Sequence, residues 1–289
     1  MCTVVKNAYA KINLTLEILN KRPDGYHEIR SVMHKVSLHD TLTFEKRYDG
    51  KIGLACSKDV CAAEDNLAYK AAKLYFEKYK ETTFDKFGIN IHIEKNIPDC
   101  AGLAGGSSDC ACVLDALREI FPGVPSEEID KIASELGSDI NFCLEKYKCA
   151  YVHGRGCDIL KLPSAGNICT LISVPDCRMK TSEVYSSFDA DPVFSEINYS
   201  EYVKNCILNG ENSKIFPMIY NSFSKVCQKK CEDISKIKEI MKQNFSFACE
   251  MSGSGSSVFG FFKSSKDRTE AGKKLENLGY KTFECETIA

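Results

Sequence analysis

The sequence predicts an α+β protein of two domains. Segments in which every second residue is apolar, such as residues 2–19 and 87–98, predict strands, and segments with apolar residues three or four apart predict helices. A short polar break at 163–167 separates two halves of this kind, and 289 residues suffice for one large or two ordinary domains. The sequence therefore favours domains at residues 1–163 and 164–289.

Charge and composition argue against several classes of protein. Lys and Arg number 38 against 40 Asp and Glu, which gives a net charge of −2 at pH 7. Composition therefore forces no strongly basic face of the kind that binds nucleic acid or a membrane surface. The N-terminal residues hold no apolar run long enough for a signal peptide, and no stretch approaches the length of a membrane span. We expect a soluble cytoplasmic protein with no nucleic-acid or membrane partner.

The chain has sixteen cysteines, an unusual number for its length. Close pairs such as Cys56 with Cys61 or Cys110 with Cys112 do not repeat as the Cys-x-x-Cys couples of zinc and iron–sulfur sites. Others, such as Cys143, lie inside apolar patterns, where a thiol behaves as a small hydrophobic side chain. We interpret them as reduced packing residues of a protein in a reducing compartment.

The most distinctive stretch runs from Ile97 to Asp109 and reads IPDCAGLAGGSSD. Its glycines permit tight turns and close approach of the backbone to a ligand, and it leads directly into a helical pattern. The free amides and positive dipole end of that helix favour an anion, and phosphate is the expected one. The simpler alternative is an ordinary helix with Ser107, Ser108 or Asp109 as its N-cap. A Walker lysine and a Gly-x-Gly-x-x-Gly fingerprint are both missing, so a nucleotide would be bound in a different way.

Upstream of this loop, the strand pattern of residues 2–19 puts Lys11 and Asn13 on one face, turned toward solvent or a cleft. A turn at 23–25 is followed by Tyr26 and His27, a pair that can stack on or hydrogen-bond a flat ring, or simply pack at a strand start. Further strands are expected at 32–36, 38–44 and 87–98, and an amphipathic helix is expected at 67–79 with Asp65 or Asn66 as its N-cap.

Beyond the loop, a helix is expected from Ser126 to Gly137, followed by a connection that holds Ser138 and Asp139, with capping of the next turn as the simplest role for Asp139. A second glycine loop at 251–257, MSGSGSS, joins two strands and is either a plain hairpin turn or a second ligand loop. Residues 189–213 are expected to be irregular. The other expected elements are strands at 149–162 around a glycine turn, 168–174, 247–251, 258–262 and 280–288, and helices at 181–189, 215–231, 233–243 and 267–279.

Four blocks of this sequence resemble the GHMP small-molecule kinases and occur in the order and approximate spacing of that family: AYAKINLTLEILNKRPDGYHEI, IPDCAGLAGGSSD, LGSDINF and MSGSGSSVFGFF. The resemblance covers nearly the whole chain. Within the family, KRPDGYH and GLAGGSSD are similar to the branch that phosphorylates a cytidine-diphosphate alcohol in the non-mevalonate isoprenoid route. The resemblance implies a mixed α/β N-terminal domain with a left-handed βαβ crossover, a ferredoxin-like C-terminal domain, and nucleotide and substrate held between them.

The same resemblance implies the nucleotide site. Asn66 and Lys95 match positions near the nucleotide, and the cofactors implied are ATP and Mg²⁺. No metal ligand is assigned, and Ser108 is suggested only by analogy with the wider family. The ATP phosphate loop would consist of Pro98, Asp99, Cys100, Ala101, Gly102, Leu103, Ala104, Gly105, Gly106, Ser107 and Ser108.

Catalytic and substrate residues follow in the same way. Lys11 and Asp139 match the catalytic pair, in which Asp139 would take the proton of the attacking alcohol and Lys11 would stabilise the developing charge. Tyr185 falls where the family places an aromatic ring that stacks on cytosine. The remaining matches, around the cytidine diphosphate part of the substrate, are Asn13, Tyr26 and His27.

The chain also departs from the family. Ile140 and Asn141 stand where Val-Pro is common, Cys157 follows the GRG where Glu is usual, and Lys180-Thr181 replaces Ser-Thr. Two alternatives remain open. A GHMP kinase for another alcohol, such as mevalonate or homoserine, would share the loops but not the DGYH turn. A non-catalytic relative that binds a ligand or nucleic acid would have no need of both Lys11 and Asp139. We expect a monomer or weak homodimer.

Overall fold

The computed structural model describes residues 3–58, 61–79 and 87–289. The chain forms two compact units, each assembled from several stretches. They differ from a linear division at residue 163, because the two long first strands, β1 (Thr3–Lys21) and β2 (His27–Arg47), run through both units. Unit 1 comprises Met1–Ala10, His39–Asp99 and Ala104–Tyr147, and unit 2 comprises Lys11–Leu38, Cys100–Leu103 and Lys148–Ala289.

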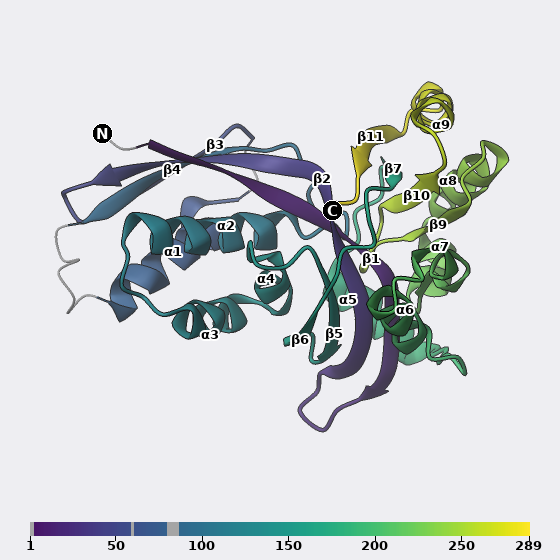
Figure 1. Ribbon diagram of the computed structural model, residues 1–289, viewed down its shortest axis with the longest axis horizontal. Coiled ribbons are helices and arrows are strands. Elements are labelled where there is room, and N and C mark those ends of the chain that lie inside the picture. Colours follow the sequence, from purple (N-terminus) through teal and green to yellow (C-terminus); the bar gives the residue numbers. More distant parts are fainter. Residues whose placement is uncertain (1–2, 59–60, 80–86) are drawn as a thin grey trace. The chain divides into compact units, whose positions relative to one another are not determined.

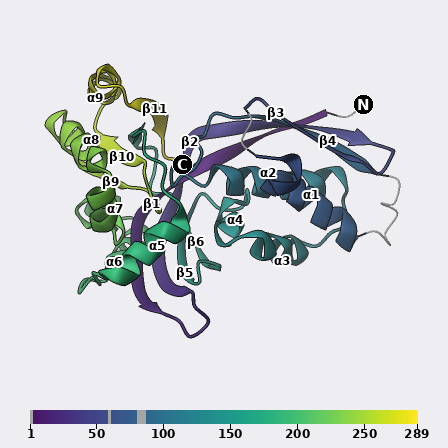
Figure 2. The same ribbon diagram turned by 180° about the vertical axis from the view of Figure 1, so that it is seen from behind.

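Unit 1 packs helices against strands. β3 (Ile52–Cys56) pairs in parallel with β4 (Gly88–Glu94), and β4 pairs antiparallel with the second part of β2. In both views, α1 (Leu67–Lys78) and α2 (Gly105–Ile120) lie side by side beneath these strands (Figures 1 and 2). The helix α1 is capped as predicted, because Asn66 Oδ1 accepts a hydrogen bond from Ala68 N at 2.9 Å. Two shorter helices, α3 (Ser126–Leu136) and α4 (Ser138–Cys143), complete the helical layer.

Unit 2 contains an antiparallel sheet of order β11-β7-β10-β9, one face of which is covered by helices α8 and α9 (Figure 2). A second group of strands, β5, β6 and β8, extends the sheet formed by β1 and β2. The bounds of these elements are β5 Cys149–Gly154, β6 Asp158–Leu162, β7 Cys169–Val174, α5 Thr181–Ala190, α6 Tyr199–Leu208, β8 Tyr220–Asn221, α7 Ser224–Lys230, α8 Glu232–Gln243, β9 Ala248–Met251, β10 Val258–Phe262, α9 Ser265–Asn277 and β11 Lys281–Glu286.

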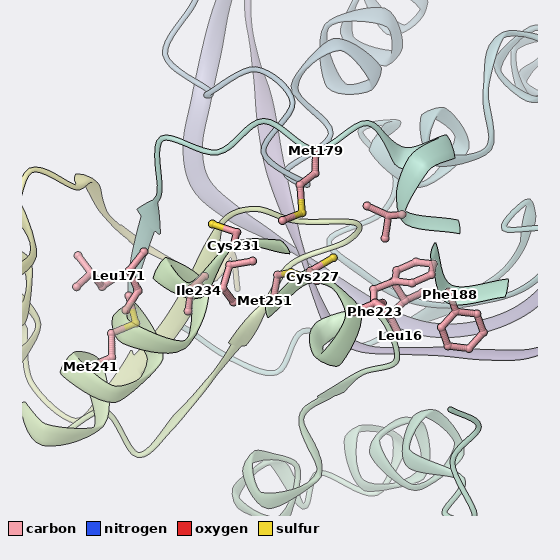
Figure 3. Close-up of a cluster of buried hydrophobic side chains, with 14 of the residues drawn as sticks. Leu16, Leu171, Met179, Phe188, Phe223, Cys227, Cys231, Ile234, Met241 and Met251 are labelled. Carbon is pink, nitrogen blue, oxygen red and sulfur yellow. The ribbon is translucent and has the colours of Figure 1, made fainter. Parts of the chain in front are cut away.

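The core of unit 2 joins these layers. Leu16 from β1, Phe188 from α5 and Phe223 pack together at one end of a continuous apolar cluster, and Leu171 and Met241 lie at the other (Figure 3). Cys227 and Cys231 belong to the same cluster, as expected of thiols used for packing. Every described cysteine is a free thiol, whereas Cys2 lies outside the described residues. In the stretches that the structure describes, we find no helix long and apolar enough to cross a bilayer.

Three expectations about helices were wrong. The stretch 189–213 contains α6, whose first amides are capped from a distant strand: both carboxylate oxygens of Glu17 accept hydrogen bonds, from Tyr199 N and Ser200 N. The stretch 215–231 is not one helix but a 3₁₀ turn (Phe216–Met218), the strand β8 and then α7. Asp139 lies inside α4 rather than on a connection. In the first case the helix depends on a partner that is remote in sequence, which local patterns do not report.

Candidate active site

The predicted phosphate loop leads into the helix α2. The N-cap residue of this helix has no polar side chain that could cap it. α2 begins at Gly105, and its N-cap is Ala104, which has a left-handed backbone with φ 59°. The alternative in which Ser107, Ser108 or Asp109 is the N-cap is therefore wrong, because all three lie within the helix. Ala104 has no polar side-chain atom to satisfy the first amides, which suits a helix start whose amides bind an anion.

The second glycine loop packs against this loop within unit 2. Ser252 Oγ donates to Gly102 O at 3.0 Å, and Ser257 N donates to Ala101 O at 3.2 Å. Gly102 has φ 76°, and a Cβ there would collide with the carbonyl oxygen of Ser252. Only glycine permits this approach of the two backbones. The loop at 251–257 is therefore more than a hairpin turn, because it supports the loop at 100–103.

Lys11 and Asn13 share a face of β1 as predicted, and that face is buried rather than exposed to solvent. Lys11 Nζ donates to Asn13 Oδ1 at 2.7 Å, and Asn13 Nδ2 donates to Ser31 Oγ at 2.8 Å. Asn13 N also donates to Ser252 Oγ at 3.3 Å, which joins this strand to the second glycine loop. Asp139, the other half of the predicted catalytic pair, is half-buried in the first turn of α4 and belongs to unit 1. The pairing of Lys11 with Asp139 stays a prediction.

Lys95, predicted near the nucleotide, has a side chain that is only 4% exposed, and it is held by two carboxylates. Its Nζ lies 2.6 Å from Asp40 Oδ2 and 2.7 Å from Asp109 Oδ2. Asp40 Oδ1 in turn accepts hydrogen bonds from Asn96 N at 2.5 Å and Ile97 N at 2.8 Å. This buried cluster of Asp40, Lys95 and Asp109 therefore fixes the backbone that enters the phosphate loop and the first turns of α2.

The electrostatics of the buried cluster follow from its depth. Burial alone would lower the pKa of Lys95, but the charges of Asp109 and Asp40 raise it above the ordinary lysine value. Burial raises the pKa of Asp109 to about 7, because the attraction of Lys95 does not fully offset the loss of water. Asp109 Oδ1 also has no hydrogen-bond partner among the described residues. Sequence reasoning did not identify Asp40, and it considered Asp109 only as a cap.

Two of the predicted base-binding residues, His27 and Tyr185, lie against each other in unit 2. Their ring centroids are 4.8 Å apart with an interplanar angle of 35°. His27 Nε2 lies 2.7 Å from Asp189 Oδ1, and Lys21 Nζ donates to Asp189 Oδ2 at 2.6 Å. We call Lys21, His27 and Asp189 the histidine cluster. Neither Lys21 nor Asp189 was predicted, because they are separated from their partners by more than 160 positions.

Tyr26 is the exposed member of the predicted base-binding set, with 54% of its surface accessible. The guanidinium carbon of Arg155 lies 3.6 Å from the centroid of its ring, a cation–π arrangement. Arg155 also lies 3.9 Å from the carboxylate of Asp24 in the same turn. Arg155 is a further residue that sequence reasoning missed, and it belongs to the GRG motif that was quoted only for Cys157.

The described residues do not form a magnesium site made of protein ligands alone. Among the described residues no three His, Cys, Asp or Glu side chains are grouped so that they could hold a metal ion. This is compatible with the way Mg²⁺ binds in kinases, where substrate phosphates and water supply most ligands. The buried Ser108 Oγ donates its proton to Tyr9 O at 2.8 Å, so its oxygen can offer a lone pair to a cation.

Comparisons with families and solved structures agree with this geometry. Residues 66–145 match the GHMP kinases N-terminal domain, and residues 206–281 match the GHMP kinases C-terminal model. The chain is similar over 99% of its length to a crystal structure of 4-(cytidine 5'-diphospho)-2C-methyl-D-erythritol kinase, with a TM-score of 0.84 and 27% identity. A homoserine kinase from Cytophaga hutchinsonii, at 15% identity and a TM-score of 0.73, shares the fold over 97% of this chain and 94% of its own.

Relatives by sequence point to the same kinase. The chain is 37% identical to a 4-diphosphocytidyl-2-C-methyl-D-erythritol kinase of Desulfitobacterium hafniense, over 97% of this chain and 94% of the relative. It is also 37% identical to the kinase of that name from Caldicellulosiruptor bescii, over 93% of both chains. These similarities extend through both compact units.

Proposed function

The chain belongs to the GHMP kinases, and within them to the 4-diphosphocytidyl-2-C-methyl-D-erythritol kinases; on that premise we propose which of its residues perform the reaction. It is an enzyme that transfers a phosphoryl group from ATP to the 2-hydroxyl of 4-(cytidine 5'-diphospho)-2-C-methyl-D-erythritol, giving the 2-phosphate and ADP. The observation that carries this conclusion is the 37% identity to a kinase of that name over nearly the full length of both chains. We place the reaction in the cytoplasm, and we expect a monomer or weak homodimer.

The phosphate loop of residues 98–108 would hold the ATP phosphates. The uncapped start of α2 offers backbone amides and a positive dipole end to an anion. Residues 100–103 of the loop are held by the second glycine loop through the hydrogen bond from Ser252 Oγ to Gly102 O. Mg²⁺, when bound, would neutralise phosphate charge, with Ser108 as the candidate protein ligand. Asn66 and Lys95 would border the nucleotide. The ammonium group of Lys95 is already paired with Asp40 and Asp109, so its side chain acts by fixing the loop.

Lys11 and Asp139 would act on the alcohol. Asp139 would accept the proton of the 2-hydroxyl as it attacks, and Lys11 would hold that oxygen and stabilise the developing negative charge. The hydrogen bond from Lys11 Nζ to Asn13 Oδ1 keeps the ammonium group oriented. Tyr26, His27 and Tyr185 would hold the cytosine ring by stacking and hydrogen bonding, while Asn13 would lie close to the diphosphate.

The catalytic assignment is tested with Asp139→Asn. Loss of the general base is expected to lower kcat by about 10²- to 10⁴-fold, while the thermal midpoint of unfolding is unchanged. The matched control is Asp130→Asn, which removes a carboxylate from an exposed ion pair with Lys146 in the same unit and should leave kcat unchanged. A near-normal kcat for Asp139→Asn would remove this residue from the base role.

The substrate assignment is tested by ADP release from ATP and Mg²⁺ with three alcohols. Turnover is expected with the cytidine-diphosphate methylerythritol and not with mevalonate or homoserine. Turnover with another alcohol would support the assignment as a kinase and contradict the assigned substrate. Failure to turn over any of them, despite ATP binding, would favour a non-catalytic relative.

A further inference from the structure

The contacts of the histidine cluster decide which nitrogen of His27 carries a proton. The Asp189 carboxylate divides its two oxygens between two partners: Oδ2 accepts from Lys21 Nζ at 2.6 Å, and Oδ1 lies 2.7 Å from His27 Nε2. An ionised carboxylate can only accept hydrogen bonds, so His27 Nε2 must be the donor. The hydrogen bond from Lys21 holds the pKa of Asp189 below its usual range, which keeps the carboxylate ionised. In the neutral imidazole, Nδ1 is then a hydrogen-bond acceptor.

We propose that Asp189 and Lys21 are positioning residues that make this enzyme select cytosine over uracil, by holding His27 in the tautomer whose Nδ1 accepts a hydrogen bond. The inference rests on the proposed function, in which His27 lies at the base. Cytosine carries an amino group at position 4, which donates, whereas uracil carries an oxygen there, which accepts. His27 Nδ1, as an acceptor, can therefore take a hydrogen bond from the amino group of cytosine. Opposite uracil, its lone pair would face the lone pairs of the uracil oxygen and no hydrogen bond would form. A site built around one hydrogen-bonding pattern rejects the inverse pattern strongly, because polar groups are left unpaired.

The helix α5 makes this arrangement rigid. Tyr185 and Asp189 are four residues apart on α5, so both project from the same face of the helix. Tyr185 packs on His27 and also on the buried Phe223, at 4.7 Å between ring centroids. The side chain of His27 is only 8% exposed. One helix therefore holds the face of the imidazole and sets its tautomer, and that helix is anchored in the core of unit 2 (Figure 3).

The variant Asp189→Asn tests the proposal because Lys21 dictates how the new amide is oriented. An ammonium group needs an acceptor, so the amide oxygen would face Lys21 and the amide NH₂ would face His27. His27 Nε2 would then become the acceptor, and the proton would move to Nδ1. A protonated Nδ1 donates, which suits the oxygen of uracil. The variant is therefore expected to move selectivity from cytosine toward uracil rather than to weaken binding in general.

The measurement is kcat/KM for the cytidine-diphosphate alcohol and for its uridine-diphosphate analogue. Asp189→Asn is expected to lower the cytidine-to-uridine ratio by about 10- to 100-fold, with part of the change coming from improved use of the uridine compound. The double variant Lys21→Met with Asp189→Asn should recover part of the cytidine preference, because the amide oxygen is then able to turn toward His27. The matched control Asp191→Asn, which breaks an exposed ion pair with Lys229 at 2.7 Å just beyond α5, should leave the ratio unchanged.

A readout independent of turnover comes from the ¹⁵N chemical shifts of the imidazole, which report the protonated nitrogen. The shifts should place the proton on Nε2 in the natural protein and on Nδ1 in Asp189→Asn, with His27→Gln identifying the signal among the five histidines. An unchanged tautomer or an unchanged ratio in Asp189→Asn would overturn the inference. The variant His27→Gln distinguishes failure of this inference from failure of the proposed function. If His27→Gln leaves kcat/KM for the cytidine compound unchanged, the cytosine ring does not contact His27. Both the proposed base site and the inference would then be wrong.

Discussion

Two charged clusters in this protein have nearly the same hydrogen-bond lengths and opposite surroundings. In the buried cluster, Lys95 lies 2.6 and 2.7 Å from Asp40 and Asp109, and the three side chains are at most 4% exposed. In the histidine cluster, Lys21 lies 2.6 Å from Asp189, but the two side chains are 57% and 31% exposed. The energy of an ion pair depends on how well water would solvate each charge if its partner were removed. A charge in the buried cluster would have little water around it, whereas Lys21 and Asp189 would be hydrated.

On the proposed function, the two clusters have different roles: one supports the backbone and the other orients a residue that recognises the substrate. The buried cluster fixes the main chain, since Asp40 also accepts from the amides of Asn96 and Ile97 at the entrance to the phosphate loop. In the proposed function, phosphate is held by backbone atoms, which carry no information about the rest of the substrate. The histidine cluster fixes a side chain, His27, and leaves the charges that hold it near solvent. We therefore expect changes in the buried cluster to alter stability, and changes in the histidine cluster to alter selectivity.

The largest expected effect is that of Lys95→Met. The substitution leaves the carboxylates of Asp40 and Asp109 buried without their cation, and removing one partner of a buried ion pair typically costs about 3–5 kcal/mol. The free energy of unfolding, measured in urea, should fall by this amount, and ATP affinity should fall with it because the loop loses its support. Adding Asp40→Asn to Lys95→Met should recover part of the loss, since it removes the buried carboxylate whose charge is left without a cation. A loss below about 1 kcal/mol would mean that the buried cluster behaves like an exposed one.

Whether a feature of the fold or of the candidate site could be predicted from the sequence depends on how far apart in the chain its residues lie. The cap of α1 by Asn66 and the shared face of Lys11 and Asn13 were predicted and are confirmed, because capping residues and strand alternation are local patterns. The glycine loop before α2 was also recognised locally, and its phosphate-binding role stays a prediction. The second glycine loop was recognised, but its role was left open. Gly102 explains why, since the atom it must accommodate belongs to Ser252, 150 positions away.

The partners of the predicted residues were missed for the same reason. Lys95 was placed near the nucleotide, but Asp40 lies 55 positions before it. His27 was placed at the base, but Asp189 lies 162 positions after it. A single sequence contains no signal that pairs such residues. Sequence therefore predicted groups expected to contact the ligands, whereas only the structure revealed the groups that orient them.

The next effect in size is a pH dependence that Asp109→Asn should remove. Burial raises the pKa of Asp109 from 3.8 to about 7, so between these values the folded protein holds a proton that the unfolded chain has released. That contribution to stability is complete below about pH 4 and is lost as the pH rises through 7. An asparagine does not titrate, so the variant should gain about 2–3 kcal/mol relative to the natural protein between pH 5 and 7.5.

This prediction concerns the difference between two proteins rather than the natural protein alone. Burial lowers the pKa of His34 to about 4, so its neutral form is favoured in the fold and stability is lost as the pH falls from 6.5 toward 4. That slope is opposite to the slope of Asp109, and it is common to both proteins, so it cancels in the difference. A difference in unfolding free energy that stays constant from pH 5 to 7.5 would show that Asp109 is ionised throughout the range.

The smallest effect on stability is expected from Lys21→Met, which tests the exposed cluster as Lys95→Met tests the buried one. The pair with Asp189 is largely exposed, and exposed ion pairs contribute about 0–1 kcal/mol, an amount that salt reduces further. Unfolding in urea should therefore change by less than about 1 kcal/mol, against the several kcal/mol expected for Lys95→Met. The cytidine-to-uridine ratio should nevertheless fall, because without Lys21 the Asp189 carboxylate is less constrained to face His27. If Lys21→Met were as destabilising as Lys95→Met, the histidine cluster would be part of the scaffold, and the separation of support from recognition would not hold.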